Sequence, residues 1–142
     1  MKDNNLINHE NEKILSDKFN GKSVLIVEDE FVSGQLISKI LKKYLRVVLV
    51  ETAEACYIKI DEEDYALIFM DINLGHGLSG LDAVKRIRSI EKYKRIPIIA
   101  TTAFAMKGDK EGFIEAGCTE YLSKPYTKER MLNLLKEIIL EY

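Results

Sequence analysis

Three carboxylates follow two short apolar runs of this chain, and their placement predicts a cation site. Glu28 and Asp29 come directly after one run, Val-Leu-Ile-Val, and Asp71 ends another. Short apolar runs of this kind are typical of buried parallel strands, and open α/β sheets bind their ligands beyond the carboxyl ends of the strands. Carboxylates gathered there repel one another unless positive charge lies between them. A divalent cation with oxygen ligands would supply that charge, and Lys124, after a later apolar run, would supply a second.

The residues around these acids predict the elements that position them, a βα unit repeated five times from Lys22 onward. Strands are expected at about 22–27, 46–50, 66–70, 96–101 and 118–123. Helices are expected at about 31–44, 52–62, 80–91, 105–116 and 127–140. In the first of these helices the apolar residues recur with helical spacing, which predicts one face that covers the sheet. They are Val32, Leu36, Ile37, Ile40, Leu41 and Tyr44.

Length and composition favour one globular domain with a polar extension. The chain has 142 residues, of which 46% are hydrophobic and 31% are charged, and its net charge is −2. This charge balance gives no electrostatic reason to bind nucleic acid or an anionic membrane. Residues 1–20 are rich in Asn, Lys, Asp and Glu, so we expect a polar tail or linker there and the domain at 21–142.

The apolar stretches of the sequence are all short. None of them is long enough to span a bilayer, and the polar N-terminus lacks the apolar core of a signal peptide. We therefore expect a cytoplasmic protein without membrane insertion. Cys56 and Cys118 lie far apart in the sequence with no second ligand at metal spacing, and we assign them no chemistry.

Four fragments at the ends of the predicted strands resemble the receiver domain of two-component response regulators. They are Glu28-Asp29-Glu30 after the first strand, Met70-Asp71-Ile72-Asn73 after the third, Thr101-Thr102-Ala103 after the fourth and Tyr121-Leu122-Ser123-Lys124-Pro125 after the fifth. The resemblance extends from Lys22 to the C-terminus. It implies a flavodoxin-like (βα)5 fold, a doubly wound α/β structure with a five-stranded parallel sheet of order 2-1-3-4-5.

The resemblance also implies a phosphorelay role for these acids. Asp71 would be the phosphoacceptor, taking a phosphoryl group from a phosphohistidine to give an aspartyl phosphate. Mg²⁺ or Mn²⁺ would be held by Asp29 and Asp71 directly, by Glu28 through water, and by the carbonyl oxygen of Asn73. A phosphatase with an aspartyl nucleophile would carry its general acid at the position of Asn73, which disfavours that class of enzyme. The chain is thus expected to be a signalling receiver that assists its own phosphorylation and dephosphorylation, and not an enzyme.

Three further residues have roles that the resemblance implies. Phosphoryl transfer needs donors aimed at the charge of the moving group. Lys124 would neutralise one phosphoryl oxygen, and the hydroxyl of Thr102 would bind another. Tyr121 stands three residues before Lys124, at the position of the family's switch aromatic, and would turn inward together with Thr102. The Lys124–Pro125 peptide bond would be cis.

The loop after Asp71 departs from the family pattern. Where many receivers have a proline four residues after the aspartate, this chain has Gly75, and Gly80 stands nine residues after the aspartate instead of eight. We expect a more mobile loop in which His76 is a solvated residue. The same loop spells Gly75-x-Gly77-x-x-Gly80, which leaves a dinucleotide-binding enzyme domain as an alternative. Against this alternative, the next strand ends in threonines and not in the acidic residue that would hold a ribose.

The expected partners are a histidine kinase or a histidine phosphotransfer protein. The chain could be a stand-alone regulator or a receiver from a hybrid histidine kinase. A homodimer or a target protein could use the face formed by the helix at 105–116, the strand at 118–123 and the helix at 127–140. On the last helix, Leu132 and Ile139 widen the apolar stripe. They either broaden the core contact or remain partly exposed and dock a partner.

Overall fold

Five parallel strands form one sheet at the centre of the molecule. The computed structural model describes residues 2–74, 79–103 and 108–141. The strands are β1 (Ser23–Val27), β2 (Arg46–Val50), β3 (Leu67–Asp71), β4 (Ile98–Thr102) and β5 (Glu120–Ser123). Their order in the sheet is β2-β1-β3-β4-β5, and every neighbouring pair is parallel. The fold class and strand order predicted from the sequence are confirmed.

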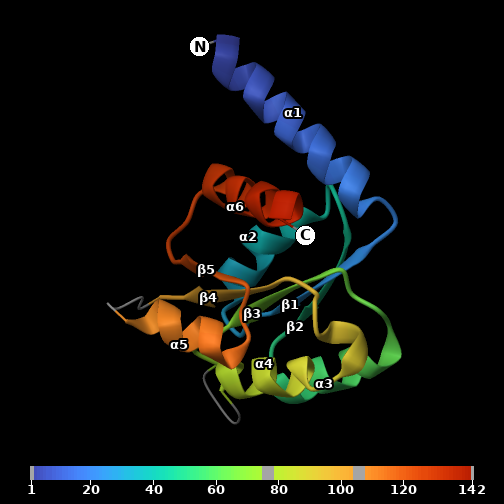
Figure 1. The fold of residues 1–142 in the computed structure, drawn as a ribbon, viewed down its shortest axis with the longest axis vertical. Helices are drawn as coiled ribbons and strands as arrows, with labels where there is room; N and C mark the ends of the chain where they lie inside the picture. The colour runs from blue at the N-terminus through green and yellow to red at the C-terminus, as the bar shows by residue number, and fades with distance from the viewer. Residues whose placement is uncertain (1, 75–78, 104–107, 142) are drawn as a thin grey trace.

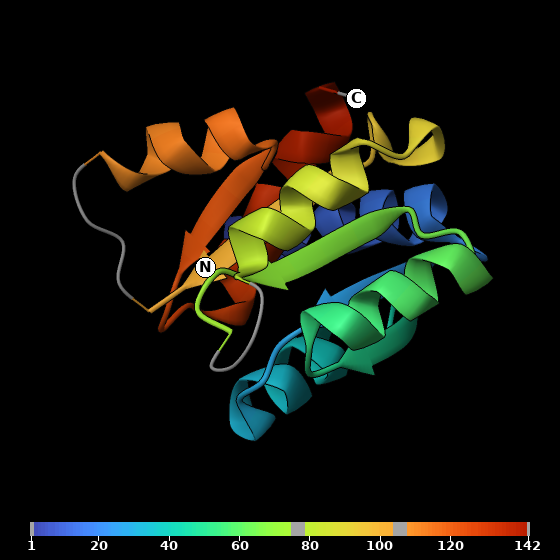
Figure 2. The same ribbon diagram turned by 90° about the horizontal axis from the view of Figure 1, so that it is seen from below.

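Helices cover both faces of this sheet (Figures 1 and 2). The helices α2 (Phe31–Leu41) and α6 (Lys128–Glu141) lie on one face. On the other face lie α3 (Ala53–Glu62), α4 (Gly80–Arg88) and α5 (Asp109–Ala116). The helix expected at 80–91 is interrupted, because α4 ends at Arg88 and the 3₁₀ turn η1 (Glu91–Tyr93) follows it. The hydroxyl of Ser89 donates to the Arg86 carbonyl oxygen at 2.6 Å, a local bond that competes with a continued helix.

The core consists of two layers, one on each face of the sheet. Alternate residues of a strand point to opposite faces, so Val24 and Ile26 of β1 pack under α2 and α6, whereas Leu25 and Val27 pack on the layer of α3, α4 and α5. All four side chains are buried. This two-sided burial is the reason that the strands are continuous apolar runs in the sequence.

The structure corrects the expectation for the N-terminal segment. Residues Lys2–Phe19 form a long helix, α1, which packs on α6 (Figure 1). Asn11, Leu15 and Phe19 lie four residues apart on one stripe of α1 and are all buried. The expectation of a tail that cannot pack is therefore wrong for the second half of this segment. The domain boundary near residue 21 stays a prediction.

The structure also bears on the two interpretations of the last helix, and for Leu132 it favours the core contact. Leu132 is 8% exposed and belongs to the same buried cluster as Leu15 and Phe19 of α1, so it is not a free docking residue. Ile139 is half-buried and packs against that cluster. Leu140, which falls outside the stripe, is 69% exposed.

The guanidinium of Arg88, at the end of α4, joins three segments at the amino-terminal edge of the sheet. Its Nε donates to the carbonyl oxygen of Gly117 at 2.8 Å. One terminal nitrogen donates to the carbonyl oxygens of Tyr93 at 2.7 Å and Ile96 at 2.6 Å, and the other donates to the hydroxyl of Thr119 at 3.2 Å. A single side chain thus satisfies the carbonyl groups of the turns that lead into β4 and β5.

The helices of the described residues are all too short or too polar to cross a membrane.

Candidate functional site

The carboxyl ends of β1 and β3 bring the three predicted acids together. The strands pair in register up to Val27 and Met70, so the residues that follow each strand are neighbours. One oxygen from each of Glu28, Asp29 and Asp71 can be chosen so that all three lie within 4.8 Å of one another. Glu28 is only 2% exposed and Asp71 only 4%, whereas Asp29 is exposed. Glu28 and Asp71 therefore form the buried part of the cluster, and Asp29 lies at its solvent-exposed side.

Strand β4 places Lys124 at this cluster. The carbonyl oxygen of Thr101 accepts the N–H of Ile72 at 2.9 Å, and that of Thr102 accepts the N–H of Lys124 at 2.8 Å. These two bonds hold the ends of β3 and β5 against the same strand. The ammonium of Lys124 makes an ion pair with Glu28 and lies 3.8 Å from Oδ2 of Asp71. The Lys124–Pro125 peptide bond is cis, as the resemblance implied.

Asn73 and Thr102 lie on the other side of Asp71. The backbone N–H of Asn73 donates to Oδ1 of Asp71 at 2.9 Å, a local turn that fixes the carboxylate. The hydroxyl of Thr102, which is 1% exposed, donates to the side-chain oxygen of Asn73 at 3.2 Å. Thr102 is therefore at the site, as predicted, and is connected to Asp71 through Asn73.

The electrostatics of the cluster leave it short of positive charge. Burial raises the pKa of Asp71 to about 6, and the neighbouring Glu28 raises it as well, while the Asn73 N–H and the Lys124 ammonium lower it. Within the described residues, Oε2 of Glu28 is buried and has no hydrogen-bond partner. An unpaired buried carboxylate oxygen beside two further carboxylates fits a hard divalent cation, which prefers oxygen ligands. The predicted acids thus form a chemically suitable metal site.

Comparison with known proteins places this arrangement in a family. The family model for the response regulator receiver domain matches residues 24–136. The chain belongs to this receiver family. Over 120 residues it is 37% identical to the polar-differentiation response regulator DivK of Brucella ovis, a match that covers 83% of this chain and 96% of that protein.

Solved receiver structures agree with this membership. One is the receiver domain of a sensor histidine kinase of Pseudomonas aeruginosa, with a magnesium ion coordinated in its active-site cleft. It is 35% identical, with a TM-score of 0.75 over 84% of this chain and 98% of its own. The chemotaxis protein CheY4 of Vibrio cholerae is 25% identical, with a TM-score of 0.77 over 82% of this chain and 98% of its own. The relatives thus include both a response regulator and the receiver domain of a sensor histidine kinase.

The loop that follows Asp71 is only partly described. Gly75, His76 and Gly77 lie outside the described residues, so the predictions for the longer loop and its histidine remain predictions. Helix α4 begins at Gly80. Its N-cap is Ser79, whose hydroxyl accepts the N–H of Asp82 at 3.2 Å. A Cβ atom on Gly80 would meet the backbone of Asp71 and Ile72, so the close approach of α4 to the end of β3 requires a glycine at this position.

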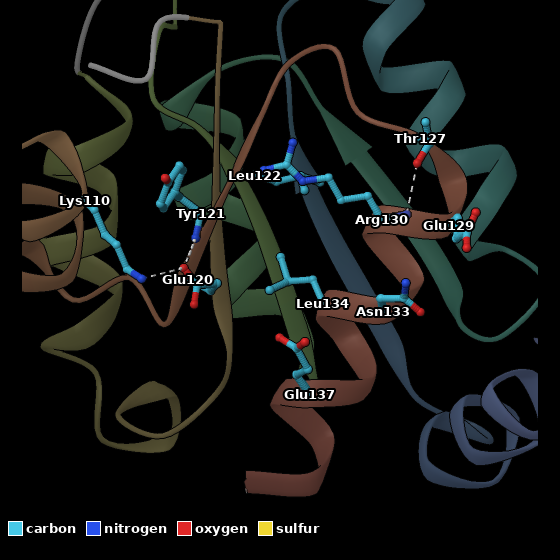
Figure 3. Close-up of a pocket in the computed structure, with 10 residues that line it drawn as sticks. All are labelled: Lys110, Glu120, Tyr121, Leu122, Thr127, Glu129, Arg130, Asn133, Leu134 and Glu137. Atoms are coloured by element: carbon cyan, nitrogen blue, oxygen red, sulfur yellow. Dashed lines mark hydrogen bonds and ion pairs between the residues drawn. The ribbon is translucent and has the colours of Figure 1, made fainter. Parts of the chain in front are cut away.

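Tyr121 lies on β5 and packs against α5. Its ring is half-buried and its centroid is 5.9 Å from that of Phe113, at an angle of 59°. Figure 3 shows Tyr121 at one side of a groove that continues between β5 and α6. The lining residues of this groove are Lys110, Glu120, Tyr121, Leu122, Thr127, Glu129, Arg130, Asn133, Leu134 and Glu137. The predicted switch residue therefore faces the predicted partner surface.

An exposed apolar patch beside the site was missed by the sequence analysis. Val32 and Leu36 were assigned to the core face of the first helix, but they are 70% and 46% exposed, and the adjacent Phe31 is 73% exposed. Leu36 also lines a pocket that reaches Lys124 and Pro125. Helical spacing identified an apolar stripe, but it could not show that α2 packs through the face of Gly34 and Ile37 and leaves the side of Val32 exposed.

Proposed function

We propose that this receiver accepts a phosphoryl group on Asp71 from a phosphohistidine of a histidine kinase or phosphotransfer protein and signals through a changed surface. The observation that carries the proposal is the buried carboxylate of Asp71 between a lysine ammonium and two further acids. Neither a solvated turn residue nor a helix cap needs such surroundings.

Asp71 supplies the nucleophilic oxygen in this proposal. The phosphorus–nitrogen bond of the donor breaks as the Asp71 oxygen–phosphorus bond forms, and the imidazole keeps the electron pair. Asn73 fixes one carboxylate oxygen through its backbone N–H, which leaves the oxygen nearest Lys124 to attack. Lys124 then neutralises charge on the transferred group, because its ammonium already lies between Glu28 and Asp71.

The acidic cluster would hold Mg²⁺ or Mn²⁺. We assign Asp29 and Asp71 as direct ligands, Glu28 as a ligand through water, and the Asn73 carbonyl oxygen as a further ligand. When bound, the cation supplies the positive charge that lets an anionic donor approach three carboxylates. Lys124 cannot supply it alone, since its ammonium is already paired with Glu28.

The surface that binds a protein phosphodonor would include Phe31, Val32 and Leu36. These exposed side chains lie on the first two turns of α2, and Leu36 lines a pocket that reaches Lys124. Exposed apolar patches mark protein interaction sites. A protein donor needs such a surface, whereas a small phosphodonor does not. The patch therefore supports a protein partner for Asp71.

Phosphorylation would redirect Thr102 and Tyr121. The Thr102 hydroxyl now donates to Asn73, and a phosphoryl oxygen on Asp71 would compete for this donor. Tyr121 would then turn inward from its contact with Phe113 and change the groove beside α6. The Tyr121 ring signals should shift when beryllofluoride is added as a phosphoryl mimic. Unchanged ring signals in NMR spectra, with beryllofluoride bound, would exclude the switch.

The decisive experiment is labelling of Asp71. Incubation with acetyl phosphate or a phosphorylated kinase should add one phosphoryl group, detected by intact mass, when Mg²⁺ is present and not in EDTA. Asp71→Asn should abolish the label. Asp64→Asn, which alters an exposed acid in the turn before β3, should leave it unchanged. Label that persists in the Asp71→Asn protein, or that forms equally in EDTA, would refute the proposal.

A further inference from the structure

The hydroxyl of Tyr126 is a buried polar group that the proposed phosphoryl transfer does not use. Tyr126 follows Lys124 and Pro125 in the chain, and the three residues line one pocket of about 410 Å³. The hydroxyl oxygen is buried and has no hydrogen-bond partner among the residues that the structure describes. A buried tyrosine hydroxyl usually has a partner, because an unpaired one lowers stability. Tyr126 therefore requires an acceptor close by.

Tyr126 and Glu28 lie in the same layer of the molecule. Tyr126 packs against the apolar cluster that contains Val24 and Ile26 of β1. Glu28 continues the alternation of these two residues, and its Cγ lies 3.7 Å from the position that a Cβ atom on Gly34 of α2 would take. Helix α2 also lines the pocket at Tyr126. Both side chains thus lie on the α2 side of the sheet, at its carboxyl edge.

Three carboxylates act on the Tyr126 hydroxyl. Burial raises the pKa of Tyr126, and the carboxylates of Glu28, Asp71 and Glu30 raise it further, because each of them disfavours a phenolate nearby. The hydroxyl therefore keeps its proton and remains a donor. An ionised carboxylate accepts hydrogen bonds and cannot donate them, so these three acids are the candidate acceptors.

The state of each carboxylate distinguishes Glu28 from the other two acids. Glu30 is exposed to water. Asp71 accepts the N–H of Asn73 at 2.9 Å and lies 3.8 Å from the Lys124 ammonium. Lys124 also pairs with Oε1 of Glu28, whereas Oε2 of Glu28 is buried and has no partner in the described part of the chain. A buried donor without an acceptor and a buried acceptor without a donor thus lie in the same layer.

We propose that Tyr126 is a positioning residue whose hydroxyl donates to Oε2 of Glu28, a bond that forms by a small rotation of the tyrosine side chain. Lys124 and Tyr126 then hold the two oxygens of this carboxylate. Each carboxylate oxygen has about two acceptor positions, so Oε2 can still bind water at the metal site. Outer partners of this kind orient metal ligands and raise metal affinity. The effect on Mg²⁺ rests on the proposed function, whereas the hydrogen bond itself does not.

Melting without Mg²⁺ tests the hydrogen bond. Tyr126→Phe removes the hydroxyl and keeps the ring, and should lower the melting temperature by about 3 °C, the effect of one lost hydrogen bond. Removal of an unpaired hydroxyl would instead leave the melting temperature unchanged or raise it. Tyr65→Phe is the matched control, because the Tyr65 hydroxyl, in the turn before β3, is also buried without a partner among the described residues. A Tyr126→Phe protein that melts at or above the parent temperature would overturn the proposal.

A double-mutant cycle shows whether the hydroxyl acts through Glu28. In a Glu28→Ala background, Tyr126→Phe should no longer lower the melting temperature, because the acceptor is absent. A purely structural role in packing would lower it by the same amount in both backgrounds. An equal fall in the two backgrounds would therefore overturn the proposal.

Mg²⁺ titration by calorimetry tests the positioning role. Tyr126→Phe should raise the dissociation constant about tenfold, as loss of an outer partner does, and Tyr65→Phe should leave it unchanged. Equal Mg²⁺ affinity of Tyr126→Phe and the parent would refute the positioning role. A parent protein that binds no Mg²⁺ would refute the proposed metal site, and the melting comparisons would still decide whether Tyr126 bonds to Glu28.

Discussion

Gly80 lies directly against the backbone of Asp71. A Cβ atom on Gly80 would lie 2.1 Å from the carbonyl oxygen of Asp71 and 2.8 Å from Cα of Ile72. The start of α4 is thus in contact with the residue proposed to be phosphorylated. Because backbone atoms cannot swing away as a flexible side chain can, any larger residue at this position must displace Asp71 or α4.

Gly80→Ala should therefore reduce both stability and phosphorylation. We expect a loss of about 1–3 kcal/mol in the free energy of unfolding, the usual cost of overpacking, together with slower labelling of Asp71. Urea denaturation and intact mass measure the two effects. The control is Gly112→Ala in α5, where a Cβ atom meets nothing within 4 Å. Equal stability of the two variants would contradict the close contact.

Mg²⁺ affinity should fall in acid because of Asp71. Its raised pKa of about 6 means that protons compete with the cation near neutral pH, since the protonated carboxyl is a poor ligand. The apparent dissociation constant should rise about tenfold between pH 7 and pH 5. Asp71→Asn should bind more weakly but with a flatter pH profile. Isothermal titration calorimetry at several pH values measures both affinities. If the Mg²⁺ affinities of the parent and of Asp71→Asn changed equally with pH, Asp71 would not be the group responsible.

Removal of the Lys124 ammonium should destabilise the metal-free protein. In Lys124→Met, the Glu28 carboxylate stays buried without its ion-pair partner, at a cost of about 3 kcal/mol. Mg²⁺ should bind and raise the melting temperature more than in the parent, because the cation then provides the missing charge. Lys92→Met, which breaks an exposed pair with Asp64, is the control and should melt as the parent does. Loss of Mg²⁺ binding in Lys124→Met would show that the lysine has a different role.

The apolar patch on α2 should affect the rate of phosphotransfer from protein donors and not from small phosphodonors. Phe31→Ala combined with Val32→Ala should slow phosphotransfer from a phosphorylated kinase about tenfold or more, the effect of truncating central interface residues. Labelling by acetyl phosphate should be unchanged. The control is Ile58→Ala, an apolar residue of α3 that is 60% exposed and lies on the other face of the sheet. Equal slowing with both donors would mean that the patch supports the site and not docking.

Sequence patterns could predict the parts of this molecule that follow local rules. Acids at the ends of apolar runs predicted the cluster of Glu28, Asp29 and Asp71, because parallel strands carry their carboxyl ends to the same edge. Burial that depends on distant segments could not be predicted in this way. Leu15 is buried only because α6 lies beside α1, and Val32 is exposed because α2 packs on the sheet through its opposite side, which carries Gly34.

The hydrogen bonds of Arg88 distinguish the amino-terminal edge of the sheet from the carboxyl-terminal edge, which carries the acidic cluster. The amino-terminal edge is stapled by one guanidinium that satisfies acceptors from three separate segments, so movement there would break several bonds at once. At the opposite edge, the described groups carry unbalanced charge and a buried oxygen without a partner. Unbalanced charge among the described groups therefore lies at the edge where chemistry is proposed, opposite the edge that the Arg88 side chain holds together.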